Sequence, residues 1–212
     1  CIIRDNYAVS QWGYGDGGGI MLSGNSSPVI EFNQITGNTS DSGGGIAVLG
    51  TSYPVINHNL IENNTASQTG GGIMVGATAE ATIASNIIRN NTTTSTSVFG
   101  GGGIALWNHV CSLGPCMDVY NNLIYGNETG TNGGGIYSRY NSSNLFNNTV
   151  WGNTAAAGGG VYVLNQGQET PIFTNSIIRN NSAASGPQIA VSGSAEFSFC
   201  NIEGGWSGTG EN

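Results

Sequence analysis

Lysine is absent from this chain of 212 residues, and charged side chains make up only 8% of it. The formal net charge is -8. Nucleic acids and anionic membranes are bound through clusters of Lys and Arg, so neither is expected as a partner. The sequence contains no apolar run of about 18 residues, so it predicts no membrane-spanning helix. Glycine is abundant, with 36 residues, but the Gly-X-Y period of collagen is missing.

The chain is instead built on an internal repeat. A Gly-Gly-Gly unit followed by Ile or Val recurs, and its last copy decays to Gly-Pro-Gln-Ile at 186–189. The intact units are at 17–20, 43–46, 70–73, 101–104, 133–136 and 158–161. Self-similarity at a period of about 20–50 residues indicates a solenoid. We interpret residues 1–205 as a single domain cut from a longer protein, and residues 206–212 as a tail after the last rung.

Two further apolar positions recur in each repeat. One precedes an Asn by three residues, as Ile35 precedes Asn38, and the other lies upstream of it, as at Ile30. The segments around these positions are bounded by Gly, Asn or Pro, which is typical of short strands and disfavours helix. The sequence therefore predicts an all-β solenoid with three short strands per rung and about seven to eight rungs. The remaining segments, such as 39–42 and 65–69, are interpreted as turns.

Asparagine recurs at two corners of the predicted rung. Asn tolerates left-handed turn geometry, and its side-chain amide can bond to the Asn of the next rung. Two Asn ladders are therefore expected. The first contains Asn33, Asn59, Asn86, Asn122 and Asn148, and the second contains Asn6, Asn38, Asn64, Asn91, Asn127, Asn153 and Asn181.

The Gly-Gly-Gly-Ile units and runs such as Val119-Tyr120-Asn121-Asn122 carry a family resemblance. The chain resembles right-handed parallel β-helix repeat proteins of the pectin-lyase-like class, and its repeats are similar to those of chlamydial polymorphic outer membrane proteins. The resemblance implies a right-handed, single-stranded parallel β-helix. It implies no particular activity, because such repeats occur in lyases, hydrolases, adhesins and structural proteins.

Catalytic candidates cluster beside an insertion at 107–118. Lyases of this class use Lys or Arg to abstract a proton, often with calcium held by acidic residues, and hydrolases use a cluster of Asp. The chain has only four Asp, in different rungs, and no paired-Asp motif. No cofactor or metal is assigned, and calcium is supported by no motif. The one plausible constellation comprises His109, Asp118, Arg139, Tyr140 and Glu169.

Aromatic residues are concentrated on the outside of rungs five and six. Tyr125 is expected to stack on Trp151, Tyr120 on Phe146, and Tyr137 on Tyr162. Such pairs stabilise exposed sheet, or they provide a surface for sugars or partners. The candidate binding residues are Trp107, Tyr120, Tyr125, Tyr137, Tyr140, Phe146, Trp151 and Tyr162.

The cysteines divide into two pairs. Cys111 and Cys116 enclose a Leu-Gly-Pro turn, and in a secreted chain we expect a disulfide between them. A metal site that also used His109 would lack a second pair of ligands. Cys1 and Cys200 both fall in the first Asn column, too many rungs apart to pair, and are expected to substitute for ladder residues.

Charged residues are expected to pair across neighbouring rungs. Glu62 with Arg89, and Arg179 with Glu203, would each place opposite charges on adjacent strands. Arg4 falls in the same outward column as Arg89 and Arg179, so three of the four Arg are explained without a catalytic role, leaving Arg139.

The functional hypothesis is a non-catalytic extracellular or cell-surface module that acts as a structural stalk, adhesin or glycan-binding segment. The alternative is a polysaccharide lyase or glycoside hydrolase with its site near the 107–118 insertion. Expected partners are a polysaccharide or cell-surface glycan, and further β-helix coils or another protein at the open ends. Scarce charge and a surface rich in Asn, Ser, Thr and Gly suggest a secreted or cell-surface location.

Overall fold

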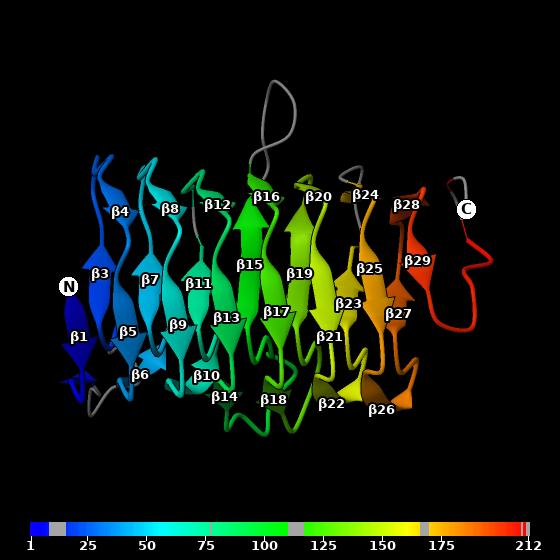
Figure 1. Ribbon diagram of the computed structural model, residues 1–212, viewed down its shortest axis with the longest axis horizontal. Coiled ribbons are helices and arrows are strands. Elements are labelled where there is room, and N and C mark those ends of the chain that lie inside the picture. The colour runs from blue at the N-terminus through cyan, green and yellow to red at the C-terminus, as the bar shows by residue number, and fades with distance from the viewer. Residues whose placement is uncertain (9–15, 77, 110–116, 166–169, 209, 211–212) are drawn as a thin grey trace.

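The computed structural model describes residues 1–8, 16–76, 78–109, 117–165, 170–208 and 210. These residues form a parallel β-helix whose rungs stack along one axis, with the N-terminus at one end and the C-terminus at the other (Figure 1). Every strand pairs in parallel with the equivalent strand of the next rung. No helix in the described residues is long and apolar enough to cross a membrane.

Four parallel sheets form the sides of the coil. Sheet A contains β1 (Ile2–Arg4), β5 (Gln34–Thr36), β9 (Leu60–Glu62), β13 (Ile87–Arg89), β17 (Leu123–Tyr125), β21 (Thr149–Trp151), β25 (Ile177–Arg179) and β29 (Asn201–Ile202). Sheet B contains β2 (Tyr7–Ala8), β6 (Thr39–Ser42), β10 (Thr65–Thr69), β14 (Thr92–Thr93), β18 (Glu128–Thr129), β22 (Thr154–Ala157) and β26 (Ser182–Ser185).

The other two sheets complete each rung. Sheet C contains β3 (Ile20–Leu22), β7 (Ile46–Val48), β11 (Ile73–Val75), β15 (Ile104–His109), β19 (Ile136–Asn141), β23 (Val161–Leu164) and β27 (Ile189–Ser192). Sheet D contains β4 (Val29–Glu31), β8 (Val55–Asn57), β12 (Thr82–Ala84), β16 (Asp118–Tyr120), β20 (Asn144–Phe146), β24 (Ile172–Thr174) and β28 (Glu196–Ser198).

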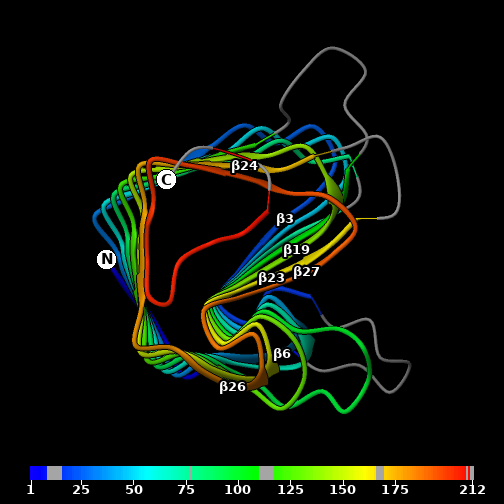
Figure 2. The same cartoon turned by 90° about the vertical axis from the view of Figure 1, so that its right-hand side faces the viewer.

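Sheet B corrects the sequence interpretation. Segments 39–42 and 65–69 are strands β6 and β10, not turns. Their inward residues are small, such as Ser40 and Ala66, both fully buried, so they lack the large apolar side chain that marks the other strands. Viewed along the coil, sheet B lies on a lobe that projects beyond the corner between sheets A and C (Figure 2). The three predicted strands per rung are confirmed, with this fourth added.

The core is a set of apolar columns that run along the coil. Ile35 of sheet A and Ile56 of sheet D are fully buried and pair with their equivalents in exact rung register. Sheet C contributes two columns, because both Ile46 and Val48 point inward and are fully buried. Each residue packs on its copy about 4.8 Å away, so a single short strand is stabilised only by its neighbours.

The two Asn ladders are confirmed. In the second ladder, Asn38 Nδ2 donates to Asn64 Oδ1 at 2.9 Å, and Asn64 Nδ2 donates to Asn91 Oδ1 at 3.0 Å. The first ladder is formed in the same way, with 3.1 Å from Asn59 to Asn86. All three of these donors are buried, where an unpaired amide would be costly.

Left-handed backbone falls one residue before each ladder Asn, not on the ladder Asn itself. Asn63 has φ of 55° and Asn90 has φ of 53°, and Gly37 fills the same column. Asn and Gly adopt this conformation readily. The paired Asn of the sequence therefore have two tasks, since the first turns the chain and the second bonds to the next rung.

The Gly triplets turn the chain from sheet B into sheet C. Gly43 has φ of 64°, which glycine adopts without steric cost. A Cβ on Gly44 would lie 2.4 Å from the carbonyl oxygen of Gly71, so the stacked turns admit no side chain there.

At the last rung, Gln188 replaces the next ladder Asn. Its Oε1 accepts a hydrogen bond from Asn181 Nδ2 at 2.8 Å.

Trp206, predicted to begin a tail, packs on Phe197 with ring centroids 4.7 Å apart. Figure 2 shows the C-terminal segment crossing the mouth of the coil. This edge of the core is therefore covered by an aromatic ring.

One predicted ion pair forms and the other does not. Arg89 Nη2 lies 2.6 Å from Glu62 Oε2, as predicted. Arg179 instead donates to Asn201 at 3.1 Å. Strand β29 ends at Ile202, although the Glu203 backbone nitrogen still donates to the Ile178 carbonyl at 3.1 Å, so the missing ion pair is a matter of side-chain direction. The Glu203 carboxylate accepts from the backbone nitrogen of Asn180.

Candidate functional site

Arg139, the central catalytic candidate, is enclosed by aromatic rings on the outer side of sheet C. Its guanidinium carbon lies 4.8 Å from the ring centroid of Tyr140, 5.0 Å from that of Trp107 and 5.3 Å from that of Phe99. Cation–π contacts of this kind stabilise a guanidinium in place. Among the described residues Arg139 makes no ion pair, and the contacts of its guanidinium are with aromatic faces.

Apart from Tyr140, no catalytic candidate has a described contact with Arg139. Asp118 is exposed at the start of β16 and accepts a hydrogen bond from Asn144 at 3.2 Å. His109 ends β15, with its backbone opposite Asn141. The sequence placed an insertion from Trp107 onward, but β15 continues to His109. Glu169 lies outside the described residues.

Tyr137 is buried, not exposed as the sequence predicted. Its side chain is fully covered and stacks on Tyr162 with centroids 5.8 Å apart, as the rung register predicted. It packs with Met74 and Ala105 in a second apolar cluster on the outer face of sheet C. Burial raises its pKa to about 12, against a smaller opposing effect of Arg139. Its hydroxyl has no hydrogen-bond partner among the described residues.

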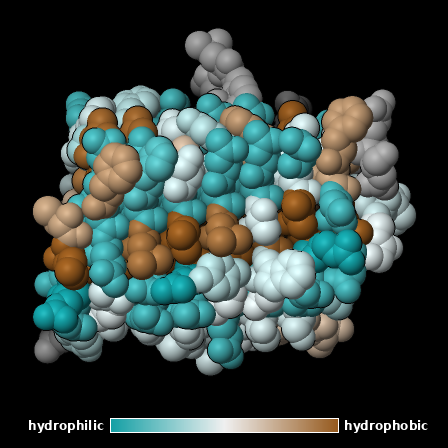
Figure 3. Space-filling model, in the orientation of Figure 1, coloured by the Kyte–Doolittle hydropathy of each residue, from teal (hydrophilic) through white to brown (hydrophobic). Residues whose placement is uncertain are grey.

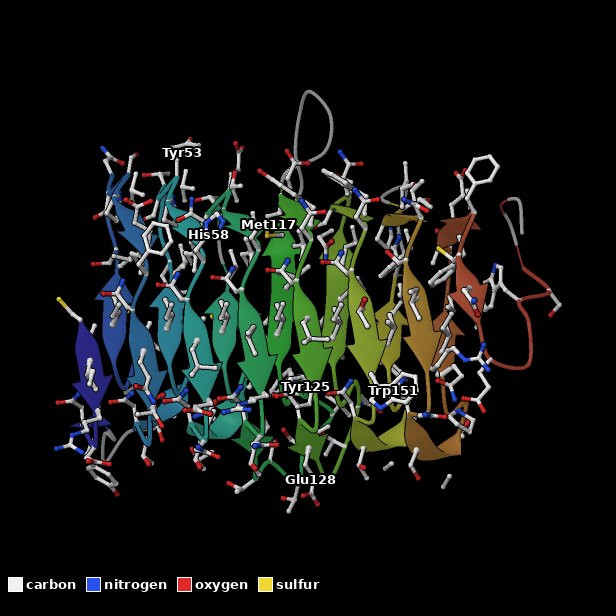
Figure 4. The ribbon with its side chains drawn as sticks, viewed as in Figure 1. Tyr53, His58, Met117, Tyr125, Glu128 and Trp151 are labelled. Atoms are coloured by element: carbon white, nitrogen blue, oxygen red, sulfur yellow. The ribbon has the colours of Figure 1, made fainter. Side chains whose placement is uncertain are left out.

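Tyr125 and Trp151 are neighbours in register on sheet A. Figure 4 shows both on this face of the coil, with Glu128 pointing away below them. The Tyr125 hydroxyl accepts a hydrogen bond from Arg89 Nη1 at 2.8 Å. Trp151 is 44% exposed. Trp151 therefore presents an exposed aromatic ring, whereas Tyr125 is held by Arg89.

Apolar side chains also line up on the outside of sheet A. Figure 3 shows an apolar band that crosses this face along the coil. Ile87, Leu123 and Ile177 are exposed in equivalent positions at the start of their strands. The band runs beside the corner where sheet D turns into sheet A, because its residues begin the strands of sheet A.

That corner carries a hollow on the last rungs. Its larger part has a volume of about 440 Å³, and an adjoining part of about 340 Å³ shares Asn147 with it. Asn175 Nδ2 donates to Asn147 Oδ1 of the neighbouring rung at 2.6 Å. Together the two parts, here called the corner hollow, are lined most prominently by Phe146, Asn147, Thr149, Asn175, Ile177 and Phe199.

The chemistry of the corner hollow is uniformly neutral. No residue that lines either part carries an acidic or basic group. Phe146 stacks on Tyr120 at 4.8 Å with nearly parallel rings, as predicted. Amides beside aromatic and aliphatic surfaces suit a ligand that has both hydroxyl groups and apolar faces.

Phe199 is the functional candidate that the sequence analysis missed. It has φ of 55° and is 63% exposed. A bulky residue in left-handed backbone is uncommon, and this one has little buried surface in return. The signal was available, because Phe199 stands where other rungs carry Asn, as at Asn147 and Asn175.

Metal and sulfur chemistry is limited in the described part of the chain. No group of three or more His, Cys, Asp or Glu there could hold a metal ion. The predicted disulfide between Cys111 and Cys116 lies outside the described residues. Cys1 and Cys200 are free thiols. Cys200 Sγ donates to the Phe173 carbonyl at 3.5 Å, as a ladder substitute would, and burial raises its pKa.

The comparisons with known proteins agree with this fold. The sequence matches a family described as right handed beta helix region over residues 1–114, slightly more than half of the chain. Comparison with curated proteins and with solved structures gives no match. Stacked parallel strands, buried Asn ladders and the repeated Gly turns extend the same coil beyond the matched residues. The chain belongs to the right-handed beta helix family.

Proposed function

We propose that the chain is a non-catalytic β-solenoid module of a secreted or cell-surface protein, and that it binds a neutral glycan in the corner hollow. One observation carries the proposal. The hollow combines the amides of Asn147 and Asn175 with the exposed ring of Phe199, and no lining residue titrates. Sugar hydroxyls pair with amides, while the C–H face of a sugar ring packs on an aromatic ring.

The same neutrality argues for binding rather than cleavage. Glycoside hydrolysis requires two carboxyl groups on either side of the bond, and elimination requires a base within hydrogen-bond reach of the proton. No lining residue supplies either group, and the one described carboxylate bonded to the lining is that of Asp118, on Asn144. Arg139, the residue that an enzyme of this class would use, has aromatic rings around its guanidinium.

Trp151 and Tyr125 supply a second candidate surface. Trp151 is well exposed, and the apolar band of sheet A runs beside it. Trp151 itself does not line the corner hollow, whereas Phe199 does. Variants at the two places therefore tell the two surfaces apart.

The test is a panel of neutral and acidic polysaccharides offered to the purified chain, with both binding and the release of new reducing or unsaturated ends recorded. We expect binding to one or more neutral glycans without products. Phe199→Ala should weaken it about tenfold or more, the loss typical of a central aromatic contact. Trp151→Ala should bind normally.

Three results would count against the proposal. Unchanged binding in Phe199→Ala would remove the corner hollow as the site. Loss of binding in Trp151→Ala alone would move the site to sheet A. Product release from any polysaccharide would restore the enzyme hypothesis and direct mutagenesis to Arg139.

A further inference from the structure

The corner hollow is the last part of a longer surface. In each rung, one residue lies between the end of the sheet D strand and the residue of the first Asn ladder. All seven have left-handed backbone, with φ between 48° and 57°. This corner strip consists of Phe32, His58, Ser85, Asn121, Asn147, Asn175 and Phe199.

The strip is continuous along the coil. The backbone nitrogens of His58, Ser85 and Asn121 each donate to the end of the sheet D strand one rung on, at 3.0–3.2 Å. Asn147 and Asn175 do the same, at 3.0 Å each. Six rung steps at about 4.8 Å place Phe32 and Phe199 roughly 29 Å apart along the coil.

Aromatic rings mark both ends of the strip. Phe32 is 68% exposed and stacks on His58, with centroids 5.1 Å apart. Phe199 is exposed to a similar extent at the other end. Neither burial nor backbone preference favours Phe at such a position, and two occurrences in one column need a common reason.

The middle of the strip is polar but uncharged. Ser85, Asn121, Asn147 and Asn175 present hydroxyl and amide groups, and all but Ser85 are exposed. The strip contains no carboxylate, amine or guanidinium, and its one basic side chain is the imidazole of His58. A hydroxyl-rich linear ligand fits this pattern better than an acidic chain, which would find no Lys or Arg along the strip.

We infer that the ligand is an extended neutral polysaccharide lying parallel to the solenoid axis, with Phe32 and Phe199 as stacking platforms at the two ends of one site. This inference rests on the proposed function and adds the length and direction of the ligand. Contacts at both ends act together, so affinity should rise with chain length until the ligand spans the strip and then level off.

The experiment uses the neutral polysaccharide that binds in the panel above, cut into oligosaccharides of defined length and titrated by calorimetry. Phe199→Ala should weaken every length. Phe32→Ala should weaken only those long enough to reach it, by about tenfold. Tyr7→Ala is the control, because Tyr7 is an exposed aromatic on sheet B, away from the strip. Thermal melts of each variant check that the fold is intact.

The experiment distinguishes failure of the extended site from failure of the proposed function. Normal binding of every length by Phe32→Ala, with loss in Phe199→Ala, would overturn the extended site and leave the proposed function standing. Equal affinity for short and long oligosaccharides would do the same. If Phe199→Ala also binds normally, or if no neutral glycan binds, the proposed function falls and this inference falls with it.

Discussion

The outer face of sheet C and the corner strip both carry aromatic residues, but they use them in opposite ways. On sheet C, Tyr137 is fully buried against Tyr162 and Met74, and Arg139 fills the space among the rings around it. On the strip, Phe32 and Phe199 stand largely in solvent. Rung register makes aromatic residues neighbours in both places. Their exposure depends on what else lies over that face of the coil.

The largest difference should be in stability. Tyr137→Ala removes a fully buried ring and should cost about 3–5 kcal/mol of unfolding free energy, as large-to-small core changes do. Phe199→Ala should change stability by less than about 0.5 kcal/mol. Urea unfolding of the two variants measures this contrast. Tyr137→Phe is the matched control, and it should gain about 1 kcal/mol because it removes a buried hydroxyl without a partner. Equal losses in the two Ala variants would contradict the distinction.

Alkaline pH should reveal the buried Tyr137. Burial raises its pKa from 10.0 to about 12, so the unfolded chain loses this proton at lower pH than the folded chain. The stability that depends on the neutral phenol is therefore complete below pH 10 and is lost as the pH rises toward 12. Urea unfolding across this range should show a steeper decline in the wild type than in Tyr137→Phe. Parallel declines would show that Tyr137 titrates normally.

A substitution at Phe199 should also separate stability from binding. Phe199→Asn restores the residue type that other rungs carry in left-handed backbone, as Asn147 and Asn175 do. We expect a gain of up to about 1 kcal/mol together with loss of glycan binding. Phe197→Asn is the contrasting variant, because Phe197 is buried and stacks on Phe173 at 4.4 Å, so it should be strongly destabilised. A less stable Phe199→Asn would mean that Phe199 is a structural residue.

The solenoid could be predicted from sequence because its constraints repeat. Large apolar residues such as Ile35 and Ile56 recur at a fixed sequence spacing from the ladder Asn. Each copy therefore indicates the same inward-facing position. Sheet B escaped prediction for the same physical reason. Its inward residues, such as Ser40 and Ala66, fill a narrow lobe where large side chains do not fit.

The candidate site was harder to predict because one residue decides it. Aligning the repeats places Tyr125 beside Trp151 and Tyr120 beside Phe146, and both placements hold. The alignment alone does not show that the Asn before a ladder Asn must be left-handed. Without that knowledge, Phe199 looks like one more apolar residue near the last strand. The sequence left Arg139 without a structural partner because two of its three aromatic neighbours, Phe99 and Trp107, come from the preceding rung.

The Asn ladders give the solenoid a direction. In each ladder the amide nitrogen of an earlier rung donates to the oxygen of a later one, so the side-chain dipoles point the same way along the coil. The second ladder starts on the oxygen side of Asn6 and finishes on the nitrogen side of Asn181. Gln188 supplies the acceptor that this last amide requires. The two edges are therefore chemically opposite: a group that extends the ladder before Asn6 must donate a hydrogen bond, and one that extends it after Asn181 must accept one.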